Sequence, residues 1–386
     1  PGCRWGAARM RQDFSPIPHL VIVLTVRRVM NESIEINSQL IDEAELDPDR
    51  SVGGDFAGQS EKSEGARKVE SRRPAGLLTE QQLKEFSQRS DAIALVYFLA
   101  HYCLIGLSGW LIWIVFPTLW CVPVLLVQAF VIGFLFSPLH ECSHGTAFRS
   151  RWLNESVLWI TALVYVVPPY FFRYFHLGHH RYTQVPGKDP SLVLPEPASL
   201  KQYLWYCAAL WFWWRNLSWI VRHAAGRIDP ATSTYVPKAR LHLMVLEARV
   251  MLALYGVLAL VVILTGYGWA LLLCWLLPRF LGEPVQRVLR VAEHVGCEES
   301  PDLLKNTRTT LSNRWLHLIA WQMPYHAEHH LYPNVPFFRL SAVHRVIAER
   351  VIVESDGYLQ GQRRIIRWLR ETPADHQGRS FETPVL

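Results

Sequence analysis

Long apolar stretches dominate the middle of this 386-residue chain and are separated by polar segments. Four of them, residues 93–116, 118–139, 243–265 and 267–289, are each longer than the ~20 residues that a helix needs to cross a bilayer. A proline separates the first two, and a Gly-Tyr-Gly turn at 266–268 joins the last two. This pattern predicts an all-α membrane protein with four transmembrane helices in two hairpins.

Two further apolar segments, residues 152–172 and 204–221, are interrupted by polar side chains. The first contains Asn154, Glu155 and a Pro-Pro pair, and the second contains Arg215 among several tryptophans. Broken apolar segments with aromatic ends are typical of helices that lie at the membrane interface. We therefore expect both segments to lie along the interface or dip into it, and not to cross the bilayer.

Positive charge is concentrated between the two predicted hairpins. The residues concerned are Arg149, Arg151, Arg173, Arg181, Lys188, Lys201, Arg215, Arg222, Arg227, Lys238 and Arg240. By the positive-inside rule this face is cytoplasmic, and an even number of spans places both termini there too. The net charge of +6 is then mainly a topology signal, with attraction to anionic lipid headgroups secondary. Nucleic acid is not expected as a partner.

The two ends of the chain differ from the apolar middle. Residues 1–85 are rich in Glu, Ser, Arg and Gly and are expected to be largely disordered, because their one apolar run, 20–26, is too short to span. Residues 86–345 form the predicted membrane domain. Residues 346–386 are expected to be a cytoplasmic C-terminal tail, which follows a helical cap on the same face.

Histidines cluster at the borders of the apolar segments. The clusters are His140 and His144; His176, His179 and His180; His294; and His326, His329 and His330. Residues at i and i+4 share one face of a helix, so an i, i+4 pair can hold one ion. In an i, i+3, i+4 triplet the middle ring points round the helix, so a triplet can reach two ions. One ion takes about four to six ligands, so nine imidazoles predict two metal ions; iron, zinc, copper and nickel are all compatible.

Each cluster also has an ordinary interpretation. An isolated pair four residues apart often occurs by chance, and a lone histidine such as His294 is more often a core or surface residue than a ligand. The clusters support one another, because four spans would bring all of them to the same side of the bilayer. The remaining histidines, such as His101, His317 and His344, have no such neighbours and are interpreted as structural.

Carboxylates beside the clusters are candidates for orienting the rings and raising their basicity. They are Glu141, Asp189, Glu293 and Glu328. For each of them, a solvated surface position is the alternative.

A polar stripe runs along the fourth predicted span. Arg279, Glu283, Gln286 and Arg290 recur every three or four residues and lead to His294, so all share one helix face. Polar groups at membrane depth usually face a bundle interior or a cavity, which predicts that the stripe lines the substrate approach to the metals. The alternative is a helix end whose long side chains snorkel to the interface.

Three motifs, HECSHGTAF (140–148), HLGHHRYTQ (176–184) and YHAEHHLYP (325–333), resemble the three histidine boxes of the membrane fatty-acid desaturase and hydroxylase superfamily. The resemblance covers residues 93–340. It implies a four-span bundle with interfacial helices and a cytoplasmic helical cap that holds two irons, with molecular oxygen as co-substrate. The eight box histidines would be ligands, and His294 would be the ninth.

The resemblance favours an O2-dependent fatty-acid desaturase acting on fatty acyl or similar membrane lipid chains. The alternative is an alkane or fatty-acyl hydroxylase, because the second box and Glu293 before His294 look more like hydroxylase relatives. A metal transporter or binding protein is a remote alternative, since it would place ligands at the bilayer midplane. The electrons would come from a cytochrome b5-, ferredoxin- or rubredoxin-type protein. Acyl-CoA desaturases carry Asn where this chain has Arg290, which leaves the last ligand of the second metal open.

Overall fold

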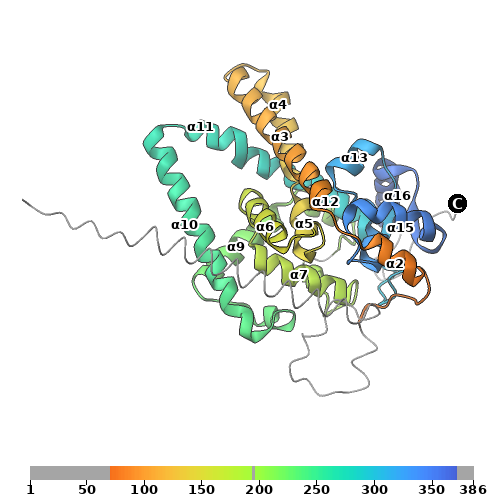
Figure 1. The fold of residues 1–386 in the computed structure, drawn as a ribbon. Helices are drawn as coiled ribbons and strands as arrows, with labels where there is room; N and C mark the ends of the chain where they lie inside the picture. Colours follow the sequence, from red (N-terminus) through yellow and green to blue (C-terminus); the bar gives the residue numbers. More distant parts are fainter. Residues whose placement is uncertain (1–69, 194–195, 372–386) are drawn as a thin grey trace, which may run out of the picture.

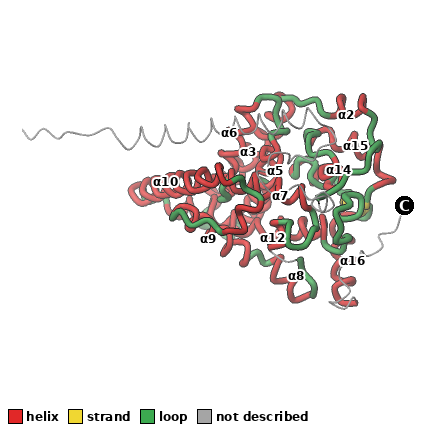
Figure 2. The backbone as a smooth tube through the Cα atoms, turned by 90° about the horizontal axis from the view of Figure 1, so that it is seen from below, coloured by secondary structure: helices red, strands yellow, loops and turns green. Residues whose placement is uncertain are grey.

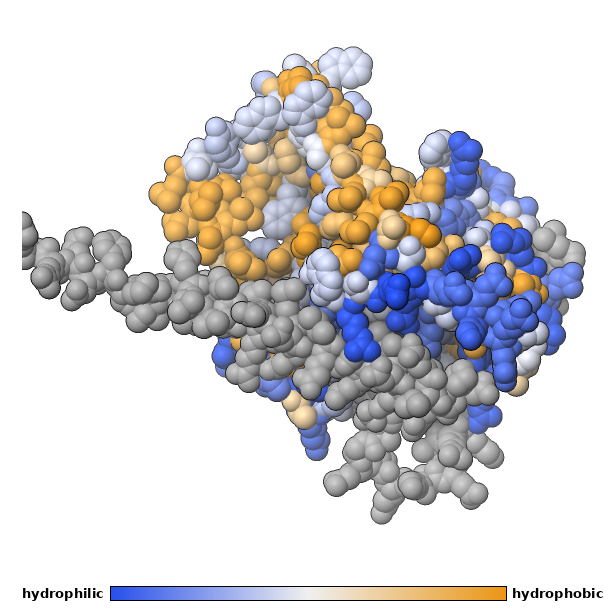
Figure 3. Space-filling view, in the orientation of Figure 1, coloured by the Kyte–Doolittle hydropathy of each residue, from blue (hydrophilic) through white to orange (hydrophobic). Residues whose placement is uncertain are grey.

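The structure is a computed structural model that describes residues 70–193 and 196–371 and consists mainly of helices (Figure 1). Most of the predicted disordered region, 1–69, and the end of the predicted tail, 372–386, lie outside the described residues. Three helical stretches among the described residues are long and apolar enough to cross a membrane: Asp91–Val115, Cys121–His144 and Lys238–Thr265. Apolar surface gathers over these stretches and polar surface over the C-terminal part of the chain (Figure 3).

The first predicted hairpin is confirmed as a pair of packed helices. It consists of α3 (Asp91–Val115), α4 (Cys121–Gly133) and α5 (Phe136–His144), which continues from α4 after a short break. The helix α4 also packs along α12 (Leu277–His294), where Gly133 faces Gly282. Because neither residue has a side chain, the two backbones come into direct contact, as small residues allow where membrane helices pack.

The second predicted pair is helical but does not pack as a hairpin. The helix α10 (Leu241–Thr265) turns at Gly266 into α11 (Gly268–Leu271), and a π-turn over Leu272–Leu276 leads into α12. Among the described helices, α10 packs mainly on α9 (Leu210–Ala224), which lies alongside it (Figure 2), whereas α12 packs on α4. The stretch from α11 to α12 is not among the three candidate spans, and its charged stripe falls within α12.

The two predicted interfacial segments are broken helices. The first forms α6 (Arg151–Tyr165) and α7 (Pro169–Tyr182), which meet at an angle of 101°, so it is not one straight span. The second forms α8 (Leu200–Cys207) and α9, which meet at Ala209, a residue with φ of +61°. Several apolar side chains of α9, including Trp214, stay exposed to the surroundings.

The cap contains a small sheet, so the all-α expectation is wrong in this detail. The strand β1 (Arg308–Thr310) pairs in parallel with β2 (Ile352–Glu354). The helices of the cap are α13 (Arg314–Ile319), α14 (His326–Leu331), α15 (Leu340–Ile347) and α16 (Gly357–Glu371), and short 3₁₀ turns cover Pro190–Val193, Pro230–Thr234, Lys238–Arg240, Phe337–Arg339 and Ala348–Arg350. Because β2 pairs with β1 and α16 packs on α12, residues 346–371 belong to the same body and do not form a separate tail.

The described part of the predicted disordered region, 70–85, is also ordered. It ends in α2 (Glu80–Phe86), whose first turn is capped by Thr79. Before it, residues 70–73, which we call the N-terminal strap, cross three distant segments. The backbone N–H of Ser71 donates to the carbonyl of Arg181 at 2.8 Å, and that of Arg72 donates to the carbonyl of Pro301 at 2.7 Å. The guanidinium of Arg73 donates to the carbonyl of Leu331 at 3.2 Å.

Candidate metal centre

The nine predicted histidines converge into two groups in the protein interior, and all nine are buried. Within each group, one ligand atom from every histidine lies within 4.8 Å of the ligand atoms of the others. The first group is His140, His144, His176, His180 and His329, and the second is His179, His294, His326 and His330. Groups of five and four nitrogen atoms match the number of ligands that two separate metal ions take.

In each triplet, the middle histidine belongs to one group and the two outer histidines belong to the other. On α7, His176 and His180 lie one turn apart and join the first group, whereas His179 joins the second. On α14 the assignment is reversed, so that only the middle histidine, His329, joins the first group. The helices α7 and α14 therefore each contribute histidines to both groups, so the two groups connect these helices.

The ligand atoms that converge are mainly Nε2 atoms. Neighbouring Nε2 atoms lie 2.9–3.2 Å apart in the pairs His144–His176, His176–His180, His180–His329, His294–His326 and His326–His330. The Nε2 atom of His140 is buried and has no hydrogen-bond partner among the described residues. Burial lowers the pKa of His326, His329 and His330 well below the usual range, so these rings are neutral at physiological pH. Neutral, converging imidazoles are the form that binds a metal ion, so the residues fit a metal at each group.

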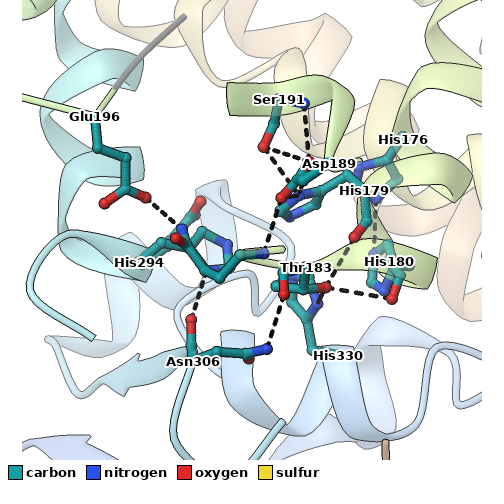
Figure 4. A network of polar contacts seen from close by, with 12 residues as sticks. His176, His179, His180, Thr183, Asp189, Ser191, Glu196, His294, Asn306 and His330 are labelled. Carbon is teal, nitrogen blue, oxygen red and sulfur yellow. Dashed lines mark hydrogen bonds and ion pairs between the residues drawn. The ribbon is translucent and has the colours of Figure 1, made fainter. Parts of the chain in front are cut away.

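Hydrogen bonds on the opposite side of the rings fix their orientation (Figure 4). The Nδ1 contacts are His179 to the Asp189 carboxylate (2.9 Å), His294 to the carbonyl oxygen of Asn306 (3.0 Å) and His330 to the hydroxyl of Thr183 (3.2 Å). Burial alone would raise the pKa of Asp189, but His179 and the donors of Ser191 hold it below its ordinary value. Burial alone would lower the pKa of His179, but the Asp189 carboxylate raises it and holds the Nδ1 proton in place. A metal at this ring would therefore bind through Nε2, in place of the proton there.

The other predicted carboxylates occupy three different positions. Glu141 lies 3.3 Å from Nδ1 of His140 and 3.6 Å from Nδ1 of His329, on the outer side of both rings. In contrast, Glu293 lies 3.6 Å from Nε2 of His326, on the converging side.

The fourth carboxylate, Glu328, bonds to residues outside the two groups. It accepts hydrogen bonds from Nδ1 of His344, at 2.6 Å, and from the hydroxyl of Thr309. These bonds tie α14 to α15 and to β1, so Glu328 holds the helix that carries the third histidine box. Sequence spacing gave no reason to single out His344, which is 16 residues from Glu328.

The polar stripe of α12 divides into a buried ion-pair network and two cavity-lining residues. Glu283 lies 3.0 Å from Arg279 and 2.7 Å from Arg287, and it accepts a hydrogen bond from the hydroxyl of Tyr165 at 2.8 Å. Arg290 lines a large cavity next to the histidines, and Gln286 lines a separate, smaller one.

The large cavity opens onto both histidine groups. Its walls include His140 and His176 of the first group and His179, His294 and His326 of the second. Aromatic side chains make up much of the rest: Phe136, Tyr165, Phe171, Phe172, Phe175, Tyr206, Phe212 and Trp219. Polar side chains such as Glu196, Asn216 and Arg287 also reach the cavity, but most of its lining surface is apolar. A mainly apolar lining is typical of a pocket for a mainly apolar ligand.

The part of the chain that contains both histidine groups matches a known protein family. The sequence model described as fatty acid desaturase matches residues 117–360, which include all nine histidines. The chain belongs to the fatty acid desaturase family. The predicted relationship is thereby confirmed, and the chain is an oxidoreductase.

Curated relatives of this desaturase-family protein are distant but cover much of its length. The sn-1 oleoyl-lipid 12-desaturase of Picosynechococcus sp. is 22% identical over 267 residues, which are 64% of this chain and 72% of that protein. The sn-1 acyl-lipid omega-3 desaturase (ferredoxin) of Synechocystis sp. is 23% identical, over 59% of this chain and 66% of that protein. The sphingolipid delta(4)-desaturase/C4-monooxygenase of Homo sapiens is 28% identical, over 55% of this chain and 60% of that protein.

One buried carboxylate that the sequence did not single out anchors the second box of this desaturase-family protein. Glu247 of α10 accepts the backbone N–H groups of Tyr170 at 2.5 Å and of Phe171 at 2.8 Å, in the first turn of α7. These N–H groups have no partner within the helix, so the carboxylate replaces the missing acceptors. Farther along α7, Arg173 donates to the carbonyl of Ser143 at 3.1 Å, which ties the second box to the first.

We expect Glu247→Gln to destabilise the protein, because the amide offers only one oxygen to the two N–H groups. Leaving one buried donor without an acceptor costs ~1–3 kcal/mol, which should lower the thermal unfolding midpoint in detergent by a few degrees. The matched control is Glu349→Gln, the same change at an exposed position of the cap. Equal midpoints for the two variants would contradict the capping role of Glu247.

Proposed function

We propose that this protein is an integral-membrane, di-iron, O2-dependent oxidoreductase that acts on fatty acyl or similar lipid chains, with desaturation as its reaction. The single observation that carries the proposal is that two groups of buried histidines open onto one aromatic-lined cavity. An apolar chain in that cavity would lie against both groups. Membership in the fatty acid desaturase family supports iron as the metal.

The protein residues would hold the metals and position the chain. Bound iron would supply the oxygen chemistry that side chains cannot perform on an unactivated methylene. The imidazoles of the two groups would hold the irons, and Asp189, Asn306 and Thr183 would keep three of the rings oriented for this. The aromatic walls exclude water and fix the chain in one place, which lowers the entropic cost of reaching the reactive geometry.

Hydroxylation is the second candidate reaction. Desaturation takes two hydrogens from the chain, together with O2, two electrons and two protons, and releases an alkene and two waters. Hydroxylation uses the same O2, electrons and protons but leaves one oxygen on the chain and releases one water. A relative named as both a desaturase and a C4-monooxygenase shows that one family member is assigned both outcomes, which keeps hydroxylation open here.

The proposed arrangement in the membrane has four crossings, with both histidine groups on the cytoplasmic side. The fourth crossing would be the stretch from α11 to α12, where Glu283 pairs with Arg279 and Arg287 inside the protein. The exposed aromatic side chains of α9 would lie at the interface. Electrons would come from a cytochrome b5-, ferredoxin- or rubredoxin-type protein, and a relative whose name includes ferredoxin supports this class of donor.

The test is expression in a host of known lipid content, followed by lipid mass spectrometry and metal analysis of the purified protein. Desaturation predicts a new lipid that is lighter by two hydrogens, and hydroxylation predicts one that is heavier by one oxygen. We also expect about two irons per protein, in keeping with the two groups of ligands. A purified protein that binds no iron, from cells with unchanged lipids, would contradict the proposed function.

A further inference from the structure

The two histidine groups are unequal, and one carboxylate lies beside the smaller group. The first group has five histidines and the second has four. Glu293 comes directly before His294, and its Oε2 atom lies 3.6 Å from Nε2 of His326. Both histidines belong to the second group, and all three residues line the large cavity.

The side of the ring that a carboxylate approaches separates Glu293 from the other acids. Glu141 and Asp189 lie beside Nδ1 atoms, on the outer side of rings whose Nε2 atoms converge. Glu293 instead approaches an Nε2 atom that is also 3.1 Å from Nε2 of His294. A carboxylate in that position faces the place where the ligand atoms meet, and it is not placed to orient a ring from behind.

The Glu293 carboxylate is also available to bind a metal. Among the described residues, no N–H or O–H group donates a hydrogen bond to it, and its side chain is 14% exposed, toward the cavity. Arg290, one turn earlier on α12, lines the same cavity and forms no ion pair with Glu293 among the described residues.

Charge balance gives a further reason for an anionic ligand. Nine neutral imidazoles would leave the charge of two divalent ions uncompensated inside the protein, and buried charge is costly unless it is paired. The first group has the Glu141 carboxylate beside two of its rings. For the second group, a carboxylate on the metal itself would offset more of the charge than Asp189 does from behind His179.

We infer that Glu293 is a metal ligand of the second group, supplying a carboxylate oxygen as the fifth protein ligand beside His179, His294, His326 and His330. This inference rests on the proposed two-metal function and adds to it the identity of the last ligand. It also gives the two sites different characters: five nitrogen ligands at the first, and four nitrogens with one oxygen at the second.

The experiment compares the full-length wild-type protein with Glu293→Gln, using anaerobic Fe(II) and, separately, Co(II) as probes. Metal content and chelator competition measure occupancy and affinity, and the visible spectrum of Co(II) reports the number and type of its ligands. We expect Glu293→Gln to weaken one of the two sites by at least ~10–100-fold, the range seen when even a residue that only supports a ligand is lost. The Co(II) spectrum of that site should change, while the other site stays filled.

Glu196→Gln is the matched control. Glu196 also lines the cavity, but it accepts a hydrogen bond from Gln184 and is not within ion-pair distance of any histidine of the two groups among the described residues. We expect this variant to bind both metals with the wild-type Co(II) spectrum. Continued filling of the first site in Glu293→Gln shows that this variant is folded, and Glu293→Asp, which keeps a carboxylate, should recover part of the lost affinity.

Two results would overturn the inference. One is a Glu293→Gln protein that binds two metals as the wild type does. The other is a variant with weakened binding but an unchanged Co(II) spectrum, which would make Glu293 a residue that only positions a ligand. In both cases a wild type with two metals leaves the proposed function standing. A wild type that takes up no metal would overturn the proposed function and the inference together.

Discussion

Replacing both His329 and His330 by alanine is expected to remove both metals, although the two residues are adjacent in the sequence. His329 belongs to the first group and His330 to the second. Replacing His329 and His180 together should remove only one metal, because both belong to the first group and their Nε2 atoms lie 3.2 Å apart. The loss of metal thus follows the spatial groups and not the sequence boxes.

Replacing any one of His180, His329 and His330 by alanine should remove one metal and nearly all activity. Losing a residue that only orients a ligand costs ~10–100-fold in metal affinity or activity, so losing a ligand itself should cost more than about 100-fold in turnover. The measurements are iron content of the purified variants and product formation in the expression host. Because the replaced histidines lie on α7 and α14, the helices of the candidate spans should still insert normally.

The control for these variants is His317→Ala, which removes a buried cap histidine outside both groups. The ring of His317 accepts a hydrogen bond from the backbone N–H of Ser312 at 3.3 Å and packs against Tyr325. We expect this variant to keep both metals with some loss of stability. If the variant with alanine at both 329 and 330 kept one metal, the exchange of middle histidines between the groups would be wrong.

The sequence predicted which nine histidines would come together but not their division into two groups. The i, i+3, i+4 spacing shows that a middle histidine such as His179 points away from its neighbours, which is a local property of one helix. Which ion that histidine reaches depends on how α7 and α14 pack against each other. That packing involves residues about 150 positions apart, so it leaves no local pattern in the sequence.

The supporting residues were harder to predict for the same reason. Asp189 was a candidate because it is close to the second box in the sequence, and the structure places it on His179. The carbonyl of Asn306 that orients His294, and the His344 ring that holds Glu328, come from distant segments. The composition of the polar region that contains the N-terminal strap indicated disorder. The strap is held by hydrogen bonds to distant segments, which composition does not reveal.

Hydropathy predicted the helices of the membrane region more accurately than their pairing. Length and apolar composition give α3, α4 and α10 directly. They do not show that α12 packs on α4 and not on α10, because that choice depends on a close fit between two glycines. Gly133 and Gly282 therefore carry information about the fold that an average over a hydropathy window cannot detect.

Gly282→Ala is expected to destabilise the protein and to weaken its metal site. A Cβ atom on Gly282 would overlap the carbonyl oxygen of Ala129 and lie 3.0 Å from Cα of Gly133, so α12 would have to move away from α4. Overpacking a tight contact costs ~1–3 kcal/mol, and backbone atoms yield less easily than side chains, which favours the upper end of that range. Because α4 leads into α5 with His140 and α12 ends at His294, the movement would also separate the two histidine groups.

The matched controls are Gly106→Ala on α3 and Gly256→Ala on α10, where an added Cβ would meet no heavy atom within 4 Å. Alanine favours a helix over glycine by up to ~1 kcal/mol, so both controls should be as stable as the wild type or slightly more so. Thermal unfolding in detergent and iron content measure the two effects. If Gly282→Ala unfolded at the wild-type temperature with two irons, the direct backbone contact between α4 and α12 would not exist in the protein, and the relative placement of His140 and His294 would need another support.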